Sequence, residues 1–219
     1  MYMLLKNILF TVLILTLSAG LVYWIEAEKE VRILCSMFET GQTRANVERT
    51  LNTANLLEID SRENVISSSS PFHLHSMSCT VSFNEMEQVT EAEFTRLIDL
   101  SGVLTVTGLI LSLALFLFQL LLALGFPLGR FAWGGQHKTL PRKLRIGSII
   151  SSVIFVLIAI LLWKNLSGSF IFPILYPVLG VLFLISSYAN FNSESVPEKL
   201  TGTPSAVLLY LCFLSLTIQ

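Results

Sequence analysis

The sequence predicts a membrane all-α helical bundle of about five transmembrane helices, with a small α+β extracytoplasmic domain inserted between helices 1 and 2. Two observations favour this fold class. Only 13% of the 219 residues are charged and 53% are hydrophobic, whereas soluble domains carry about 25% charged residues. The apolar residues also lie in long runs, and crossing about 30 Å of hydrocarbon takes roughly 20 helical residues.

The apolar runs give five candidate spans, at residues 8–25, 100–126, 146–163, 169–189 and 204–219. Pro173 and Pro177 lie near the start of the fourth, where a kink is tolerable. The fifth is short, and we count it because Pro204 is well placed to begin a helix. The chain then divides into an anchor helix (1–25), an inserted α+β domain (26–97) and a four-helix transmembrane domain (98–219).

The first apolar segment has two interpretations. Lys6 and the small residues Ser18 to Gly20 are also features of a cleaved signal peptide. Hydrophobicity continues through Leu21–Ile25, beyond a normal signal core. We therefore favour an uncleaved anchor.

Charge is distributed unevenly along the chain. All but two of the fifteen acidic residues lie between Glu26 and Asp99. The stretch 125–145 has no acid but holds Arg130, Lys138, Arg142, Lys143 and Arg145. Since Lys and Arg in short loops mark the cytoplasmic side, we expect this stretch and the N-terminus on the cytoplasmic side of the membrane, and residues 26–97 outside the cytoplasm.

The inserted domain begins with two predicted helices. Val31, Leu34 and Phe38 share one helical face. Gly41 then interrupts the chain, and Thr43 is placed as the N-cap of a second short helix. That helix is expected to turn Val47 and Leu51 inward.

Two or three antiparallel strands are predicted next, at 56–59, 65–67 and 76–83. In the last of them Cys79, Val81 and Phe83 alternate with polar residues. His73 and His75 have a usable spacing for metal ligation, but no third ligand stands nearby. We therefore expect a surface hairpin there rather than a metal site.

The segment Phe38–Thr43, followed by Val47, Leu51 and strands, resembles the small α+β domains of the BamE/SmpA type of bacterial envelopes. The resemblance spans about 55 residues within 30–85 and depends on a Gly-x-Thr-x-x-x-Val motif. In such a domain the glycine permits the turn and the threonine caps the helix. A shared fold does not transfer function, and this chain lacks that family's lipoprotein cysteine near its N-terminus.

Cys35 and Cys79 both lie on the expected oxidising side. One is on the first helix of the inserted domain and the other at an inward strand position, so we predict a disulfide between them. Two unpaired buried thiols are the alternative. Cys212 lies within the last span, where we expect it only to pack.

A glycine-rich loop follows the second span. Residues 125–135 read Gly-Phe-Pro-Leu-Gly-Arg-Phe-Ala-Trp-Gly-Gly, and Leu140–Arg145 begin the third span. This pattern resembles an uncharacterised family of small bacterial four-span membrane proteins with a Gly-x-Pro-x-Gly-x-x-x-Trp-Gly-Gly loop. The resemblance covers residues 112–219, and it implies no activity.

The loop itself has two interpretations. In the first it is a tight interfacial turn whose basic residues contact anionic lipid headgroups. In the second its glycines and Arg130 bind an anionic ligand. The residues concerned are Gly129, Arg130, Trp133, Gly134, Gly135, Arg142, Lys143 and Arg145.

The spans hold no Asp, Glu, His, Lys or Arg away from their ends, which disfavours ion-coupled transport. Gln119 is the one strongly polar side chain well inside a span, and we expect it to hydrogen-bond a neighbouring helix. No cofactor is predicted. Nucleic acid is not an expected partner, because the basic stretch is short and juxtamembrane; membrane lipids, an envelope protein or a second copy of the chain are.

We therefore expect a non-enzymatic envelope scaffold, assembly or sensing component that acts through its inserted domain. A small channel or uncoupled transporter in the four-span half is the alternative. A membrane enzyme around Arg130, Trp133 and His137 is the least favoured hypothesis, because these residues lack a nucleophile or carboxylate.

Overall fold

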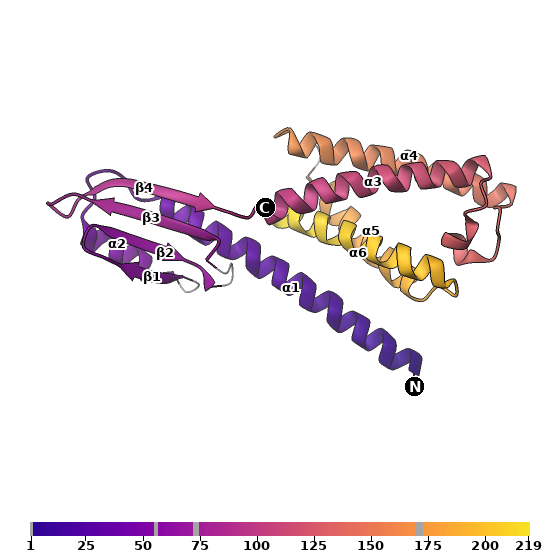
Figure 1. Ribbon diagram of the computed structural model, residues 1–219, viewed down its shortest axis with the longest axis horizontal. Helices are drawn as coiled ribbons and strands as arrows, with labels where there is room; N and C mark the ends of the chain where they lie inside the picture. The colour runs from indigo at the N-terminus through magenta and orange to yellow at the C-terminus, as the bar shows by residue number, and fades with distance from the viewer. Residues whose placement is uncertain (1, 55–56, 72–74, 170–172) are drawn as a thin grey trace. The chain divides into compact units, whose positions relative to one another are not determined.

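The computed structural model describes residues 2–54, 57–71, 75–169 and 173–219. The chain divides into two compact units, an N-terminal unit (Met1–Asp99) and a four-helix unit (Leu100–Gln219) (Figure 1). The N-terminal unit contains α1 (Tyr2–Ser36), α2 (Arg44–Leu51), β1 (Glu58–Ser61), β2 (Val65–Ser69), β3 (Met77–Phe83) and β4 (Val89–Arg96). The four-helix unit contains α3 (Leu100–Leu124), two 3-10 turns η2 (Gly129–Phe131) and η3 (Trp133–Gly135), α4 (Arg142–Leu166), α5 (Leu175–Phe191) and α6 (Val196–Ile218).

The predicted anchor and the first helix of the inserted domain form one continuous helix, α1, of 35 residues. Residues 26–36 contain Glu, Ala, Lys, Arg and Leu, all strong helix formers, and no Gly or Pro to end the helix. At 1.5 Å per residue α1 is about 50 Å long, more than the thickness of the hydrocarbon core. Its last turns are therefore available to the core of the folded domain.

The sheet is a four-stranded antiparallel meander in the order β1-β2-β3-β4. The sequence prediction located β2 and β3 and placed β1 two residues early, with Leu56 outside the described residues, but it omitted β4. A bulge between Ser82 and Phe83 shifts the register against β4. The inward residues of β4 are consequently Val89, Ala92 and Phe94, which break the two-residue period expected of a strand.

One core holds this domain together, and it forms where α1 and α2 cover one face of the sheet (Figure 1). Its buried residues are Val31, Cys35, Phe38, Val47, Leu51, Ile66, Cys79, Val81, Phe83 and Val89. The predicted inward positions of α2 and β3 are confirmed. Thr43 is the N-cap residue of α2, as predicted, but its side chain does not make the predicted capping hydrogen bond; its backbone bridges to Gln88.

The structure contains the predicted disulfide between Cys35 and Cys79, with Cα atoms 5.5 Å apart. It joins α1 to the middle of β3 inside the core. A second link lies nearer the membrane-spanning part of α1, where Arg96 at the end of β4 forms ion pairs with Glu28 at 2.8 Å and Asp99 at 3.1 Å. The Glu28 side chain is only 8% exposed. The sheet is thus fastened to α1 at two levels.

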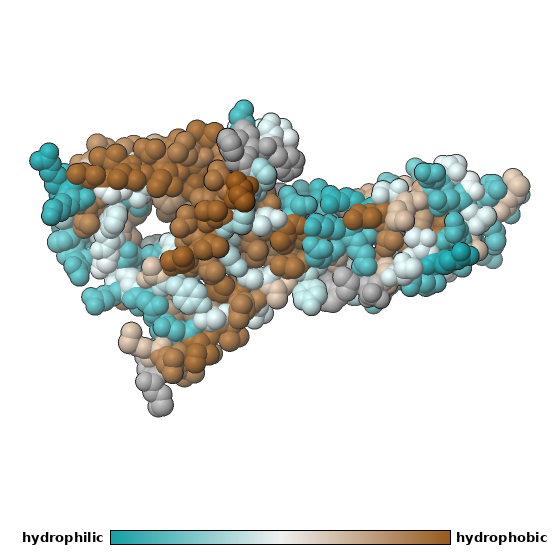
Figure 2. Space-filling model, turned by 180° about the vertical axis from the view of Figure 1, so that it is seen from behind, coloured by the Kyte–Doolittle hydropathy of each residue, from teal (hydrophilic) through white to brown (hydrophobic). Residues whose placement is uncertain are grey.

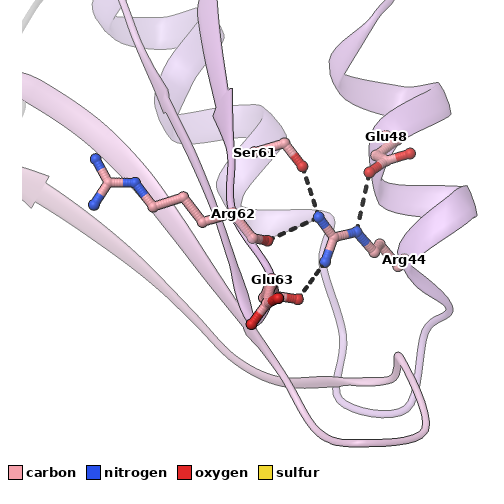
Figure 3. Close-up of polar contacts among 5 residues, drawn as sticks. All are labelled: Arg44, Glu48, Ser61, Arg62 and Glu63. Atoms are coloured by element: carbon pink, nitrogen blue, oxygen red, sulfur yellow. Dashed lines mark hydrogen bonds and ion pairs between the residues drawn. The ribbon is translucent and has the colours of Figure 1, made fainter.

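Arg44 fastens α2 to the β1–β2 turn (Figure 3). Its Nε pairs with Glu48 Oε1 at 3.1 Å, and its two Nη atoms donate to Ser61 Oγ and to the carbonyls of Arg62 and Glu63 at 2.6–2.8 Å. The guanidinium also lies 5.4 Å from the ring centre of Phe83. Four of its five N–H donors are used, three of them in holding the turn.

We expect Arg44→Met to loosen this turn, because a methionine supplies none of the four hydrogen bonds and leaves two carbonyls without a partner. A loss of about 2 kcal/mol is typical of such a change. The measurement is the rate of trypsin cleavage after the exposed Arg62. We expect this rate to rise by at least about tenfold, because trypsin cleaves only the molecules in which the turn has opened. Arg49→Met, at an exposed position on the same helix, is the control; equal rates in the two variants would contradict the prediction.

In the four-helix unit α3 contacts both α4 and α6, and α5 contacts α6 (Figure 1). Among the described helices, α1, α3, α4 and α6 are long and apolar enough to cross a membrane, and α5, with 17 residues, is shorter. The apolar helices of the predicted membrane protein are therefore present, with different boundaries for the last two. Residues 170–172, inside the predicted fourth span, lie outside the description.

The predicted start of the last helix is wrong. Pro204 lies inside α6, which begins eight residues earlier at Val196. Ser195 is the N-cap and accepts a hydrogen bond from the Glu198 backbone N–H, while Pro197 occupies the first turn, where its missing N–H costs nothing. The loop expected at 190–203 is consequently mostly helix, and α6 reaches 23 residues.

Small residues bring the helices of this unit together. On α3 the buried Ser101, Thr105, Gly108 and Ser112 form one stripe. A Cβ at Gly108 would lie 2.7 Å from Cys212 Sγ, so α3 and α6 touch closely at this point. This agrees with the predicted packing role of Cys212. Close approach through small residues is typical of helix pairs in membranes.

Candidate functional site

The predicted site loop consists of the two 3-10 turns between α3 and α4. Backbone φ is +57° at Trp133, +79° at Gly134 and +68° at Gly135. The left-handed conformation favours glycine, so the Gly-Gly pair permits a sharp turn here. The turn brings the loop against the start of α6, some 60 residues later in the chain.

The glycine N–H groups of the loop are engaged within the protein. Gly129 donates to the Lys138 carbonyl at 3.1 Å, Gly135 to the Ala132 carbonyl at 3.0 Å, and Gly134 to the Glu198 carboxylate at 2.9 Å. A Cβ at Gly129 would also lie 2.3 Å from the His137 carbonyl oxygen. An anion cradle needs convergent free N–H groups, and these three serve the fold instead.

Glu198 is the centre of a set of contacts that we call the loop–α6 clasp, formed by Arg130, Gly134, Ser193, Ser195 and Glu198. The buried Glu198 carboxylate accepts from the Gly134 N–H and from the Ser193 hydroxyl. The Ser195 hydroxyl donates to the Arg130 carbonyl. The clasp therefore ties the α3–α4 loop to the beginning of α6.

Sequence reasoning did not single out Glu198. A signal for it exists, because Ser195 and Glu198 have the Ser-x-x-Glu spacing of a capping box. In an ordinary capping box the glutamate reaches back to the N-cap backbone N–H. Here the Ser195 N–H donates to Ser193 Oγ, and the carboxylate is directed to the loop.

Trp133 and Arg145 attach the loop to α4 and to its own ends. Trp133 Nε1 donates to Ser148 Oγ at 3.1 Å, and its ring lies against Gly147, where a Cβ would come within 2.7 Å. Arg145 Nε donates to the Leu140 carbonyl at 2.8 Å, and its guanidinium covers Gly125. Both side chains have structural roles that their sequence pattern does not reveal.

The other basic residues of the predicted site, Arg130, Arg142 and Lys143, have exposed side chains, as has His137. The Arg145 guanidinium, in contrast, is half-buried and lies against Gly125. The structure thus brings the glycines and Trp133 together as a folded turn. Contact of Arg130, Arg142 and Lys143 with lipid headgroups stays a prediction.

A cavity of about 340 Å³ lies among the four helices, beside the loop. Figure 2 shows a hollow in this unit, at the left of the view. All four helices contribute polar groups to its lining, namely Gln119, Ser151, Ser186, Asn190, Glu198 and Ser205. Aromatic rings complete the wall, from Phe118, Phe131, Trp133, Phe155 and Phe183.

Gln119 does not make the interhelical hydrogen bond that the sequence suggested. Its side-chain oxygen is buried and has no hydrogen-bond partner among the described residues. Buried polar atoms in folded proteins are nearly always paired. The unpaired oxygen is therefore the feature of this cavity that most needs an explanation.

A second, apolar cavity of about 320 Å³ adjoins the first. The two share Leu115, Phe118, Phe131, Gly202 and Ser205, and the second adds Leu128 and Thr201. Phe131 and Thr201 are exposed, so this cavity opens to the surface between α3 and α6. Together they form one path from an apolar opening to a polar interior.

The predicted histidine pair falls partly outside the structure. His73 lies outside the described residues, and His75 Nδ1 is 2.9 Å from Ser69 Oγ. In the part of the chain that the structure describes, no three His, Cys, Asp or Glu side chains come together as a metal site would require.

The chain was compared with models of known protein families, with curated proteins and with solved structures, and none of the three comparisons finds a match.

Proposed function

We propose that this protein is a five-span component of a bacterial inner membrane, with its N-terminus in the cytoplasm and residues 26–97 in the periplasm. In this proposal the α+β domain binds a partner and acts as a non-enzymatic scaffold, assembly or sensing element. The proposed orientation is supported by the basic loop at 125–145 and by the Cys35–Cys79 disulfide, which suits an oxidising compartment. The short α5 is the fifth span of this proposal. The resemblances to the BamE/SmpA type and to the four-span family stay predictions.

The orientation is tested with an impermeant maleimide on intact cells, using variants with one added cysteine at an exposed position in a Cys212→Ala background, where the other two cysteines form the disulfide. Arg49→Cys on α2 is expected to react, and Lys143→Cys on α4 only after permeabilisation. The reverse pattern would overturn the orientation.

The observation that best supports a binding role is the composition of the sheet face opposite the core. Ladder partners point to the same side of a sheet, so Asp60, Ser67, Thr80 and Glu93 form one row across all four strands. A parallel row contains Glu58, Ser69, Ser78 and Thr95. This open face is thus rich in hydroxyl groups, with carboxylates at both edges.

Charge indicates the kind of partner. Residues 26–99 contain thirteen acidic residues and six Lys and Arg, an excess of seven negative charges. Complementary charge speeds association and selects partners, so the open face fits a protein surface rich in Lys and Arg. The disulfide and the Glu28–Arg96 pair hold the face rigidly on α1, which reduces the entropic cost of binding.

The test is a photo-crosslinking amino acid at Thr80, in the centre of the open face, in cells carrying the full chain. Arg49 on α2, at the opposite side of the sheet, is the control position. We expect a discrete adduct when the crosslinker is at Thr80 and none when it is at Arg49. The Thr80 adduct is expected to be lost with Glu91→Lys or Glu93→Lys, which reverse charges on the open face. It is expected to persist with Glu39→Lys, which lies between α1 and α2. Equal adducts at Thr80 and Arg49, or no adduct at Thr80, would contradict the proposal.

The alternative, a channel or uncoupled transporter, has one feature in its favour, the cavity of the four-helix unit. Beyond this cavity, however, Leu162, Tyr176, Cys212, Phe213 and Leu216 pack as a buried cluster. Passage through the unit requires these side chains to separate. We therefore favour binding over conduction.

A further inference from the structure

We propose that the two adjoining cavities of the four-helix unit bind one neutral membrane lipid, whose hydroxyl headgroup donates to Gln119 and whose acyl chains leave between α3 and α6. Diacylglycerol is the chemical class that we commit to. This inference goes beyond the proposed function, because it concerns a different unit of the chain and needs no partner on the sheet.

The first argument is the gradient of polarity. The inner cavity offers carboxamide and hydroxyl groups from Gln119, Ser151 and Asn190, whereas the outer one lacks these three residues, adds Leu128, and exposes almost wholly apolar surface. A headgroup and a hydrocarbon chain need these two environments in this order. Each cavity is within the range of small-molecule sites, roughly 300–1,000 Å³.

The second argument is depth. Gln119 lies five residues before Leu124, the last residue of α3, or about 7.5 Å along the helix axis. In a membrane this is near the boundary between headgroups and acyl chains. The Gln119 side chain therefore stands near the level where a lipid keeps its own polar end.

The third argument selects the headgroup. The unpaired Gln119 oxygen is an acceptor and calls for a donor. No Lys or Arg is among the described residues that line either cavity, and the Glu198 carboxylate is part of the inner wall. The Glu198 carboxylate would thus repel a phosphate, and no lining cation would compensate for this repulsion. A hydroxyl group, in contrast, can donate the hydrogen bond that the Gln119 oxygen lacks.

The loop–α6 clasp forms one wall of the site. Phe131 and Trp133 of the loop form part of the inner wall, and Glu198 is both a clasp residue and a lining residue. On the opposite side the buried cluster around Phe213 fills the unit. A lipid that enters between α3 and α6 is consequently bounded by the loop on one side and by this cluster on the other.

The experiment uses the purified full chain in phosphatidylcholine nanodiscs with a trace of photoactivatable diacylglycerol, or of phosphatidic acid with the same acyl chains. Adducts are mapped by mass spectrometry. We expect diacylglycerol to label the cavity walls on α3 and α6 about tenfold more than phosphatidic acid does, the effect of one buried hydrogen bond together with the charge repulsion. Gln119→Leu is expected to bring the two lipids to nearly equal labelling.

Filling the cavity provides the second readout. Ser205→Phe is expected to abolish cavity labelling, and Leu208→Phe, at an exposed position of the same helix, to leave it unchanged. Leu115→Trp fills the same space from α3 if the first variant does not fold. Equal labelling by both lipids, insensitivity to the filling variants, or loss of labelling on adding free glycerol would overturn the proposal. None of these results depends on an adduct at Thr80.

Discussion

Replacing Cys35 with serine is expected to destabilise the α+β domain by about 4 kcal/mol, because the disulfide closes a loop between residues 44 positions apart. In the chain-entropy model the bridge restricts the unfolded chain, and the restriction grows with the loop. A domain with one small core has a small free energy of unfolding, so this loss is a large fraction of it. Since serine at position 35 also places a hydroxyl among Val31, Phe38 and Val81, the loss is not smaller than the entropic figure.

The measurement is pulse proteolysis of the purified chain across a urea series, with fragments of the α+β domain identified by mass spectrometry. Cys79→Ser is expected to give a similar shift, and the double variant a shift well below the sum of the two, because either change removes the same bond. Cys212→Ala, outside this domain, is the control. An unchanged urea midpoint for Cys35→Ser would show that α1 and β3 are held by packing alone.

Replacing Glu198 with leucine is expected to open the loop–α6 clasp. Leucine keeps the volume near that of glutamate but accepts no hydrogen bond, so the Gly134 N–H and the Ser193 hydroxyl lose their partner. A buried donor left unpaired costs about 1–3 kcal/mol. Glu198→Gln retains an acceptor oxygen and is expected to lose much less.

Two measurements on detergent-solubilised protein distinguish the leucine variant from the glutamine variant. The thermal midpoint is expected to fall clearly for Glu198→Leu and slightly for Glu198→Gln. Trypsin cleavage after the exposed Arg130 and Lys138 is expected to accelerate in the leucine variant. If the leucine and glutamine variants behave alike, the carboxylate does not hold the loop, and Ser195 with its contact to the Arg130 carbonyl becomes the main connection.

The sequence predicted the features that depend on local composition. Runs of apolar residues indicated the long helices, alternation located β3, and the place of Cys35 on a helix with Cys79 at an inward strand position paired them correctly. In each case the signal lies within one segment, because hydrophobic length and period are properties of consecutive residues.

Prediction was poorer where two local signals competed. The sequence prediction took Pro204 as the start of the last helix, although the stronger capping signal, at Ser195, lies nine residues earlier in the chain. β4 was missed because a bulge disturbed its period. The break assumed between the anchor and the domain helix has no breaker residue to cause it, and α1 continues. These errors concern boundaries, where neighbouring segments compete for the same residues.

By itself, then, the sequence determined that this is a protein of long apolar helices with one small disulfide-linked domain, since both properties follow from which residues can be buried. Only the tertiary structure decided what the glycine-rich loop does and that a cavity lies beside it. Gly134 and Glu198 are 64 positions apart, and Gln119 lacks a partner only because of where α4, α5 and α6 pass. Such contacts depend on the paths of several helices at once, and no single segment encodes them.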